Sequence, residues 1–161
     1  MINLDMSFKV LANTLPHIVW IADTEGKTYF LNTEWFNYTG LTEFGERSDR
    51  LKVIHKDDLD LCLSSWQKSV LTSIPYEIEY RIKNKETGKY RWFLGRAYPI
   101  LDDTGIVTSW FGTVIDIHEK KSTTDWLMKS MKEISEENNT CKHKLTLLRD
   151  KLKSVLDEYS I

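Results

Sequence analysis

The residue types that usually carry chemistry are sparse in this sequence and poorly spaced for it. Cys62 and Cys141 form neither a disulfide framework nor a pair with metal-ligand spacing. Paired carboxylates are candidates for acid–base catalysis, but the three pairs fall at an expected helix start, a turn and a solvated helix face: Asp57–Asp58, Asp102–Asp103 and Glu136–Glu137. The sequence therefore predicts no catalytic residue, no metal site and no enzymatic activity.

Length and composition describe an ordinary soluble chain. Its 161 residues are 41% hydrophobic and 29% charged, which is enough apolar content for a packed core. The net charge of −2 gives no reason to expect nucleic acid or a membrane surface as a partner. Because no apolar run is long enough to span a bilayer and no secretory signal is visible, we expect a cytoplasmic protein.

The composition changes near residue 118. All seven glycines and all three prolines lie at or before Gly112, and only two aromatic residues, Trp126 and Tyr159, follow residue 118. We therefore expect three parts: an amphipathic N-terminal helix over residues 1–16, a folded domain over residues 17–118 and a long helix over residues 119–161.

The tail carries an apolar stripe with strict 4-3 spacing, which is typical of a coiled coil. The stripe consists of Leu127, Met131, Ile134, Asn138, Cys141, Leu145, Leu148, Leu152, Val155 and Tyr159. Asn138 falls at an a position and favours a parallel, two-stranded homodimer. The charges leave an antiparallel pair open, because Glu137 attracts Lys142 across a parallel pair whereas Lys144 repels Arg149. Packing of the stripe on its own domain is a further alternative, but a small domain cannot cover a stripe this long.

His143 has a catalytic alternative, because histidine kinases carry their phosphate acceptor on a dimeric helix. It falls at the solvent-facing f position, and the acceptor context of such helices is absent between Cys141 and Arg149. The chain also lacks ATP-binding glycine motifs. That the tail leads into the dimerisation domain of a histidine kinase nevertheless stays open as an alternative.

The first 118 residues predict helices around a sheet. Strands are expected over His17–Asp23, Thr28–Leu31, Tyr76–Lys83, Tyr90–Leu101 and Ile106–His118. Helices are expected over Met6–Leu15, Asn32–Tyr38 and Asp57–Leu71, with an irregular segment over Leu41–Arg50. Asn32 is expected to cap its helix and Gly40 to end it.

This order predicts an α+β fold, with a five-stranded antiparallel sheet and helices on one face. The last strand is apolar on both of its sides, so the N-terminal helix or a partner subunit is expected to cover the second face.

Six motifs, in order and at matching spacings, resemble the PAS domain family, in the subtype common in bacterial sensors. They are Asn32–Gly40, Ile54–Asp58 followed by Trp66, Glu79–Arg81, Gly88–Trp92, the set Pro99, Asp102–Gly105, Trp110 and Gly112, and finally Asp116–His118. Two positions depart from the family pattern: Lys56 stands in place of a proline, and His118 in place of the usual threonine.

The resemblance implies a sensory module with a cavity between the sheet and the helices. Its output would pass through the last strand into a coiled coil, as in the input part of a histidine kinase or a similar regulator. A downstream kinase or effector domain and a small-molecule ligand are the implied partners. Alignment to the family places the candidate cavity wall at Trp35, Glu79, Arg81, Phe93, Gly95, Ala97, Trp110, Gly112 and Val114.

The orientation of the third strand stays open. Burial argues that the face with Tyr76, Ile78, Tyr80 and Ile82 points inward, whereas the family alignment aims Glu79 and Arg81 at the cavity. Under the second interpretation, Glu79 and Arg81 would bind a charged ligand or pair with each other. The small residues at Gly95, Ala97 and Gly112 leave room for a ligand, or let aromatic side chains such as Trp35 pack close.

The sequence predicts that the module carries no cofactor. The light-sensing branch of the family needs a cysteine in a specific motif before the long helix, and Cys62 lies inside that helix instead. Haem needs an axial ligand, yet no histidine lies between Asp57 and Trp110. A haem or flavin sensor of light or redox state remains the alternative function.

The residues expected to couple the domain to the tail are Asp116, Ile117, His118, Lys120 and Thr124. Extending the heptads backward places Ile117 and Thr124 at a positions and Lys120 at a d position, so the stripe is weak at the junction. Our hypothesis is that two helix arrangements are nearly balanced there, so that a small change in the domain favours one of them.

Overall fold

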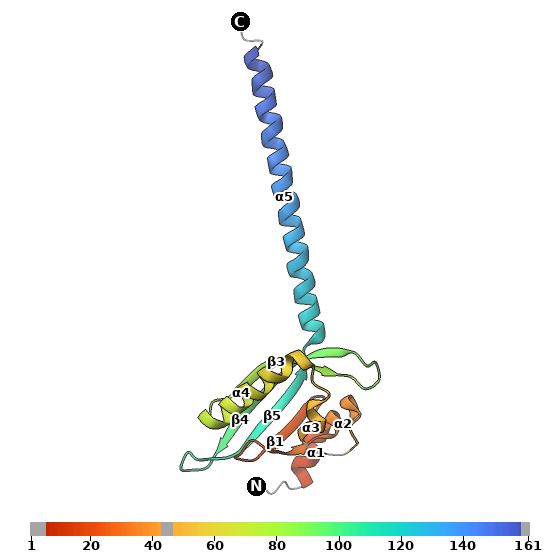
Figure 1. Ribbon diagram of the computed structural model, residues 1–161, viewed down its shortest axis with the longest axis vertical. Helices are drawn as coiled ribbons and strands as arrows, with labels where there is room; N and C mark the ends of the chain where they lie inside the picture. The colour runs from red at the N-terminus through yellow and green to blue at the C-terminus, as the bar shows by residue number, and fades with distance from the viewer. Residues whose placement is uncertain (1–5, 43–46, 159–161) are drawn as a thin grey trace. The chain divides into compact units, whose positions relative to one another are not determined.

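The structure is a computed structural model that describes residues 6–42 and 47–158. Figure 1 shows the elements in chain order, which are α1 (Met6–Thr14), β1 (Ile18–Ala22), β2 (Thr28–Leu31), α2 (Thr33–Thr39), α3 (Arg47–Leu51), the 3-10 turn η1 (Lys56–Asp58), α4 (Leu59–Thr72), β3 (Tyr76–Lys83), β4 (Tyr90–Leu101), β5 (Val107–Asp116) and α5 (His118–Glu158). The five strands form one antiparallel sheet in the order β2-β1-β5-β4-β3. The expected α+β fold is confirmed.

Some elements differ locally from the expected ones. β5 ends at Asp116 and α5 begins at His118, so the strand does not run on through His118. Part of the segment expected to be irregular forms the short helix α3. Gly40 ends α2 as expected, since it adopts the left-handed conformation (φ 75°) and its N–H donates to the Phe36 carbonyl. Asn32 occupies the N-cap position of α2, but its side chain makes no capping hydrogen bond there.

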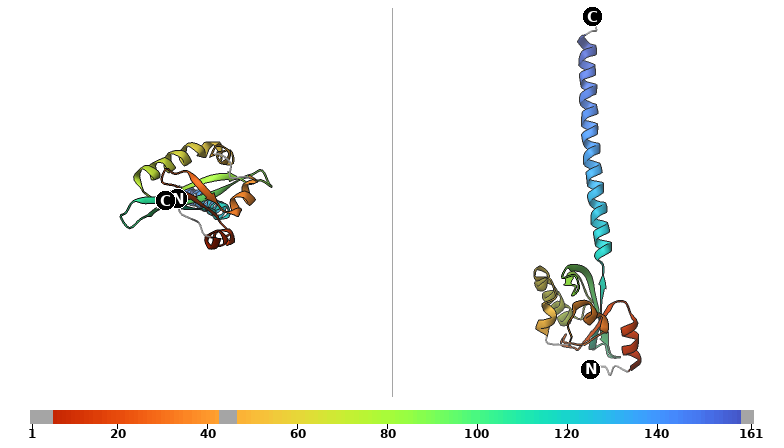
Figure 2. Two further views of the ribbon diagram at one scale, coloured as in Figure 1. Left: turned by 90° about the horizontal axis from the view of Figure 1, so that it is seen from below. Right: turned by 90° about the vertical axis from the view of Figure 1, so that its right-hand side faces the viewer.

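Helices lie on both sides of the sheet (Figure 2, right). We call the face against α2 and α4 the inner face; it carries Trp20, Phe93 and Trp110. We call the opposite face the outer face. On it the Phe8 ring of α1 packs edge-on against Phe30 and Phe111, at centroid distances of 5.6 and 6.4 Å. The N-terminal helix therefore covers part of the second face of β5.

β3 is an edge strand of the sheet, and the backbone of its C-terminal half is paired with another segment of the chain. The segment before η1 forms a bridge between Ile54 and Ile82. The His55 N–H donates to the Arg81 carbonyl, and the Lys83 N–H donates to the Val53 carbonyl, at 2.9 and 2.8 Å. Backbone groups that an edge strand usually presents to solvent are thus paired within the domain.

Contacts divide the chain into two compact units, Met1–His118 and Glu119–Ile161. The first contains the sheet and its covering helices, and its core is built on the inner face. The described part of the second unit is the helix α5.

Candidate functional site

The inner face is packed by an aromatic cluster centred on Trp66 of α4. The Trp66 ring meets Trp20, Trp110 and Tyr76 edge-on, with centroid distances of 5.1, 5.2 and 5.4 Å. Its indole N–H donates to the Gly26 carbonyl at 3.0 Å, which fixes α4 to the turn between β1 and β2. Four large rings from one helix and three strands therefore occupy the space between α4 and the sheet.

Two glycines of the inner face explain how these rings fit. A Cβ atom at Gly112 would collide with the Trp20 ring, which lies across it from the neighbouring strand. A Cβ atom at Gly95 would lie 2.7 Å from the Tyr80 ring. Of the two roles left open for the small residues, close packing of aromatic side chains is the one observed, with Trp20 and Tyr80 as the side chains involved.

Cys62 is buried in the same core cluster as Tyr80, and Tyr76 belongs to the second buried cluster. Burial, together with the nearby Asp58 charge, raises the pKa of the Cys62 thiol to about 12. Burial also raises the pKa of both tyrosines. These groups are neutral at physiological pH, so the core holds a protonated thiol rather than a reactive thiolate.

The structure gathers most of the expected cavity-wall residues on the inner face. Seven of them are buried: Trp35, Phe93, Gly95, Ala97, Trp110, Gly112 and Val114. The indole nitrogens of Trp35 and Trp110 are buried without a hydrogen-bond partner.

Glu79 and Arg81 do not belong to this wall: of the two orientations left open, the one that aimed them at the cavity is wrong. Tyr76, Tyr80 and Ile82 of β3 are buried, whereas Glu79 is exposed. The burial argument therefore held, and the family alignment failed at this strand because alternate residues of a strand point to opposite faces.

Arg81 instead binds Asp58 at the start of α4. Its guanidinium donates to both carboxylate oxygens, at 2.7 and 2.9 Å, and its backbone N–H donates to the same carboxylate at 2.9 Å. Hydrogen bonds from Arg81 hold the pKa of Asp58 below its usual range. The guanidinium also lies 5.0 Å from the centroid of the Trp92 ring.

Asp58 was expected to lie at the N-terminal end of the helix dipole, and it does occupy the N-cap position of α4. Its side chain makes no capping hydrogen bond, however. The sequence reasoning missed the Asp58–Arg81 pair because the two residues are distant in sequence and adjacent only once β3 lies beside the start of α4.

The end of β5 is the second polar site, and it contains three of the five expected coupling residues, Asp116, Ile117 and His118. The Asp116 carboxylate accepts a hydrogen bond from Arg91 Nε of β4 at 2.7 Å. Its other oxygen accepts the backbone N–H of His118, the first residue of α5, at 2.8 Å. The Ile117 N–H donates to the Trp92 carbonyl at 2.9 Å. Arg91 was not singled out from the sequence.

Tyr38 connects this polar site to the core. Its ring packs edge-on against Phe93, 4.9 Å between centroids. Burial, together with the negative charge of Asp116, raises the pKa of Tyr38 to about 12. A side chain of α2 thus packs against the inner core, and its pKa depends on the charge at the end of β5.

The stripe of α5 is exposed over its described length. Leu127, Met131, Ile134, Leu145 and Leu148 are between 49% and 70% exposed, and Asn138 and Cys141 are exposed as well. The side chains of Leu152 and Val155, and the whole of Tyr159, lie outside the described part of the structure. At the junction, Lys120 and Thr124 are exposed, and the Thr124 hydroxyl donates to the Lys120 carbonyl at 2.9 Å.

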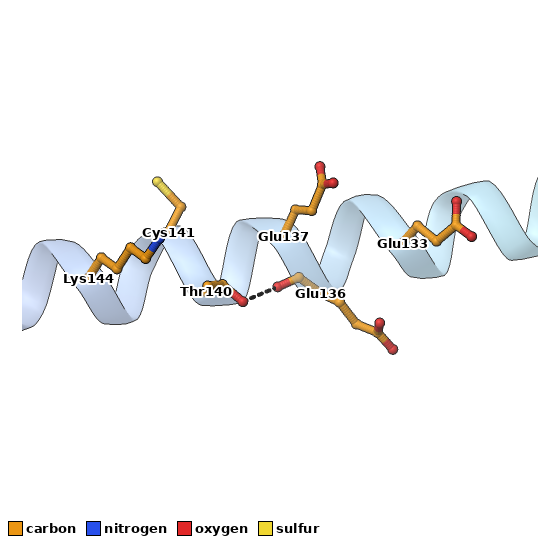
Figure 3. Close-up of a pocket in the computed structure, with 6 residues that line it drawn as sticks. All are labelled: Glu133, Glu136, Glu137, Thr140, Cys141 and Lys144. Carbon is orange, nitrogen blue, oxygen red and sulfur yellow. Dashed lines mark hydrogen bonds between the residues drawn. The ribbon is translucent and has the colours of Figure 1, made fainter.

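Figure 3 shows a hollow on the surface of α5, lined by Glu133, Glu136, Glu137, Thr140, Cys141 and Lys144. Glu137 and Cys141 project to one side of the helix and Glu136 to the other. Because one helix alone lines it, this hollow does not enclose a ligand.

Within residues 6–42 and 47–158, no group of three or more His, Cys, Asp or Glu side chains could hold a metal ion. The helices of this part of the chain include none that is both long and apolar enough to cross a bilayer.

Comparison with known proteins gives a family match and several relatives. The sequence profile of the PAS fold family matches residues 28–114. The chain is 32% identical over 132 residues to a peroxide stress-activated histidine kinase of Schizosaccharomyces pombe, covering 81% of this chain and 8% of that protein. It is 22% identical over 142 residues to the hybrid signal transduction histidine kinase H of Dictyostelium discoideum, covering 62% of this chain and 10% of that protein.

A solved structure of a sensory box histidine kinase/response regulator from Burkholderia thailandensis is 21% identical, with a TM-score of 0.54. The match covers 80% of this chain and 98% of that one. The chain thus spans only about a tenth of the length of these curated relatives.

Proposed function

The chain belongs to the PAS fold family and is related to the sensor domains of histidine kinases; from this premise we propose that it is a sensory module that pairs with a second copy and passes a signal from β5 into α5. In this role it serves as the input part of a histidine kinase or a similar regulator, and catalyses no reaction itself. Its likeness to histidine kinases supports this context.

The observation that carries the proposal is that the Asp116 carboxylate accepts two hydrogen bonds, one through each oxygen. One carboxylate oxygen binds Arg91 of β4 and the other binds the N–H of His118. A shift of β4 relative to β5 therefore changes the hydrogen bond that Asp116 makes to His118, the first residue of α5. Tyr38 extends this connection to the inner core, because its ring touches Phe93.

Homodimerisation is supported by the exposed stripe of α5. An apolar stripe with 4-3 spacing gains stability by burying its side chains against an identical stripe. Leu127, Leu145 and Leu148 are each about half exposed or more in the single chain. Burial of one such leucine typically contributes about 1.5–3 kcal/mol, so several of them suffice to hold two helices together.

Substitution of the stripe tests the pairing. We expect Leu148→Asp, at a d position, to convert the protein to a monomer, because it would bury two carboxylates in the seam. Leu147→Asp is the matched control: Leu147 is 51% exposed and Leu148 63% exposed, but Leu147 lies off the stripe and its variant stays dimeric. Light scattering coupled to size exclusion measures both, and a wild-type monomer would contradict the proposal.

The module works without flavin or haem in this proposal. Trp20 and Tyr80 fill the inner face where it is widened by Gly112 and Gly95, so a planar cofactor would have to displace them. His55, the histidine nearest to α4, packs on the Tyr90 ring and accepts the Asp57 N–H through Nδ1. We therefore expect purified protein to show no absorption band in the visible range, and a flavin or Soret band would overturn this part.

A histidine kinase fragment is the second candidate, and the relatives favour it because two of them are histidine kinases. In that case the tail leads into a kinase dimerisation domain. Incubation with labelled ATP and an active kinase core separates the two functions. Phosphate on His143 would identify the tail as an acceptor helix, whereas an unlabelled His143 supports a sensory tail.

A further inference from the structure

Two asparagine side chains join the end of α1 to the start of α2, each bonding to the backbone at the end of the other helix. We call this reciprocal pair of contacts the Asn13–Asn32 exchange. The Asn13 side-chain oxygen, near the C-terminal end of α1, accepts the backbone N–H and the hydroxyl of Thr33, each at 2.8 Å. Thr33 is the first residue of α2, so Asn13 takes the capping role that Asn32 leaves vacant.

Asn32 performs the reverse function. Its side-chain amide donates to the Ala12 carbonyl of α1 and to the His17 carbonyl, both at 2.8 Å, and its oxygen accepts the Val19 N–H at 2.9 Å. Asn32 is 1% exposed, so the loss of these bonds would leave buried polar groups unpaired. Each helix end is therefore held by a side chain that belongs to the other end.

The rest of α1 is loosely attached. Ala12 is its only buried residue, while Val10 and Leu11 are about 60% exposed. Beyond the asparagine contacts, α1 packs through the Phe8 ring on Phe30 and Phe111 of the outer face. A helix of nine residues is marginal alone in water, so α1 depends on these contacts for its order.

α2, in contrast, is rooted in the core. Trp35 is 6% exposed among core residues of the inner face, and Tyr38 packs on Phe93. α2 thus contacts the inner core through Trp35 and Tyr38. It contacts α1 through its first residue, Thr33.

We propose that α1 is a detachable cover of the outer face, and that the Asn13–Asn32 exchange couples its docking to the position of α2. A change in the inner core that displaces α2 breaks the exchange, frees α1 and uncovers Phe30 and Phe111. By thermodynamic reciprocity, loosening α1 must loosen the start of α2 by the same factor.

Amide hydrogen exchange of the full chain, resolved by NMR, tests the coupling. We expect Asn13→Ala to speed exchange of the α1 amides of residues 10–13 about 5-fold or more, the factor that corresponds to a lost helix cap. Asn13→Asp keeps an acceptor for Thr33 and is expected to restore exchange close to the wild-type rate. Thr14→Ala is the matched control, because the Thr14 hydroxyl bonds only to Leu11 within α1.

Two further variants approach the device from its opposite ends. Phe8→Ala removes the ring contacts with Phe30 and Phe111 and is expected to speed exchange of the Thr33 amide at the start of α2. Trp35→Phe loosens α2 from the core side and is expected to speed the α1 amides. Exchange in central β5 should stay slow in all variants.

The proposal is overturned if α1 exchanges at the wild-type rate in Asn13→Ala and Trp35→Phe, or if the Thr33 amide is unaffected by Phe8→Ala. Equal acceleration of amide hydrogen exchange in β5 would also overturn it. The variants would then act through global stability rather than through the Asn13 and Asn32 hydrogen bonds.

Discussion

At the scale of single residues, Asp58 shows how one carboxylate can join two elements. It accepts three hydrogen bonds from Arg81 and thereby ties the start of α4 to β3. A hydrogen bond to a buried charged group stabilises a protein by about 1.5–3 kcal/mol. The same guanidinium lies 5.0 Å from the centroid of the Trp92 ring.

The pH dependence of stability follows from this pair. Arg81 lowers the pKa of Asp58 in the folded state. The stabilisation is therefore complete above the pKa of an unfolded aspartate, about 4, and is lost as the pH falls through the lower folded pKa. We expect Asp58→Asn to lower the free energy of unfolding at neutral pH by about 1–3 kcal/mol.

Urea denaturation between neutral and strongly acidic pH measures this effect. The stability of Asp58→Asn should fall less steeply with acidification than that of the wild type. Asp60→Asn is the control, because Asp60 lies exposed in the first turn of α4. Parallel pH curves for Asp58→Asn and the wild type would contradict the assignment.

At the scale of elements, the strands were accessible from the sequence because alternation and turn residues define them locally. The bounds of β2, β3 and β4 match the expected ranges. The partners of Asp58, Asn32 and Asp116 were not accessible, because each depends on which distant elements lie side by side. The inner-face packing was foreseen only as two alternatives, since glycine spacing alone does not reveal which ring occupies the space.

The junction of β5 and α5 is the element that our coupling hypothesis concerns. Lys120 and Thr124 occupy d and a positions of the extended heptads and are exposed. Replacement of both by leucine adds apolar area to the seam of the dimer. We expect the dissociation constant of the dimer to fall at least about 100-fold, given the usual contribution of a buried leucine.

Analytical ultracentrifugation measures the dissociation constant, and pulsed EPR distances between labels near residue 128 report the helix arrangement. The hypothesis of two nearly balanced arrangements predicts that the double variant narrows a broad wild-type distance distribution. Lys121→Leu, one position beyond the d position, is the control. An unchanged distribution and affinity in the double variant would refute the hypothesis.

At the scale of the whole molecule, the chain combines two unlike units. The sheet domain buries its own aromatic side chains, whereas α5 exposes the apolar residues of its stripe. The first unit is therefore stable through internal packing, whereas the second buries its stripe only in the pairing of two copies that we propose. This division follows from composition alone, because glycine, proline and nearly all aromatic residues are confined to the first unit.

Cys141 reports the arrangement of two copies. It occupies a d position and is exposed, whereas Cys62 is buried. In a parallel, in-register dimer Cys141 faces its own copy, so mild oxidation should convert the protein to a covalent dimer on a non-reducing gel. Cys141→Ser should abolish this band. A monomer band that persists in the oxidised wild type would contradict the parallel, in-register arrangement.

The closed edge of β3 has a consequence for how copies of this chain can meet. Exposed strand edges are the usual templates for uncontrolled growth of sheets from one molecule to the next. Here the segment of residues 53–55 and the Asp58 carboxylate occupy the backbone donors and acceptors from Arg81 to Lys83. Loss of the Asp58–Arg81 pair would free the Arg81 N–H at that edge, so an acidified or Asp58-substituted protein should form fibrillar aggregates more readily than the wild type.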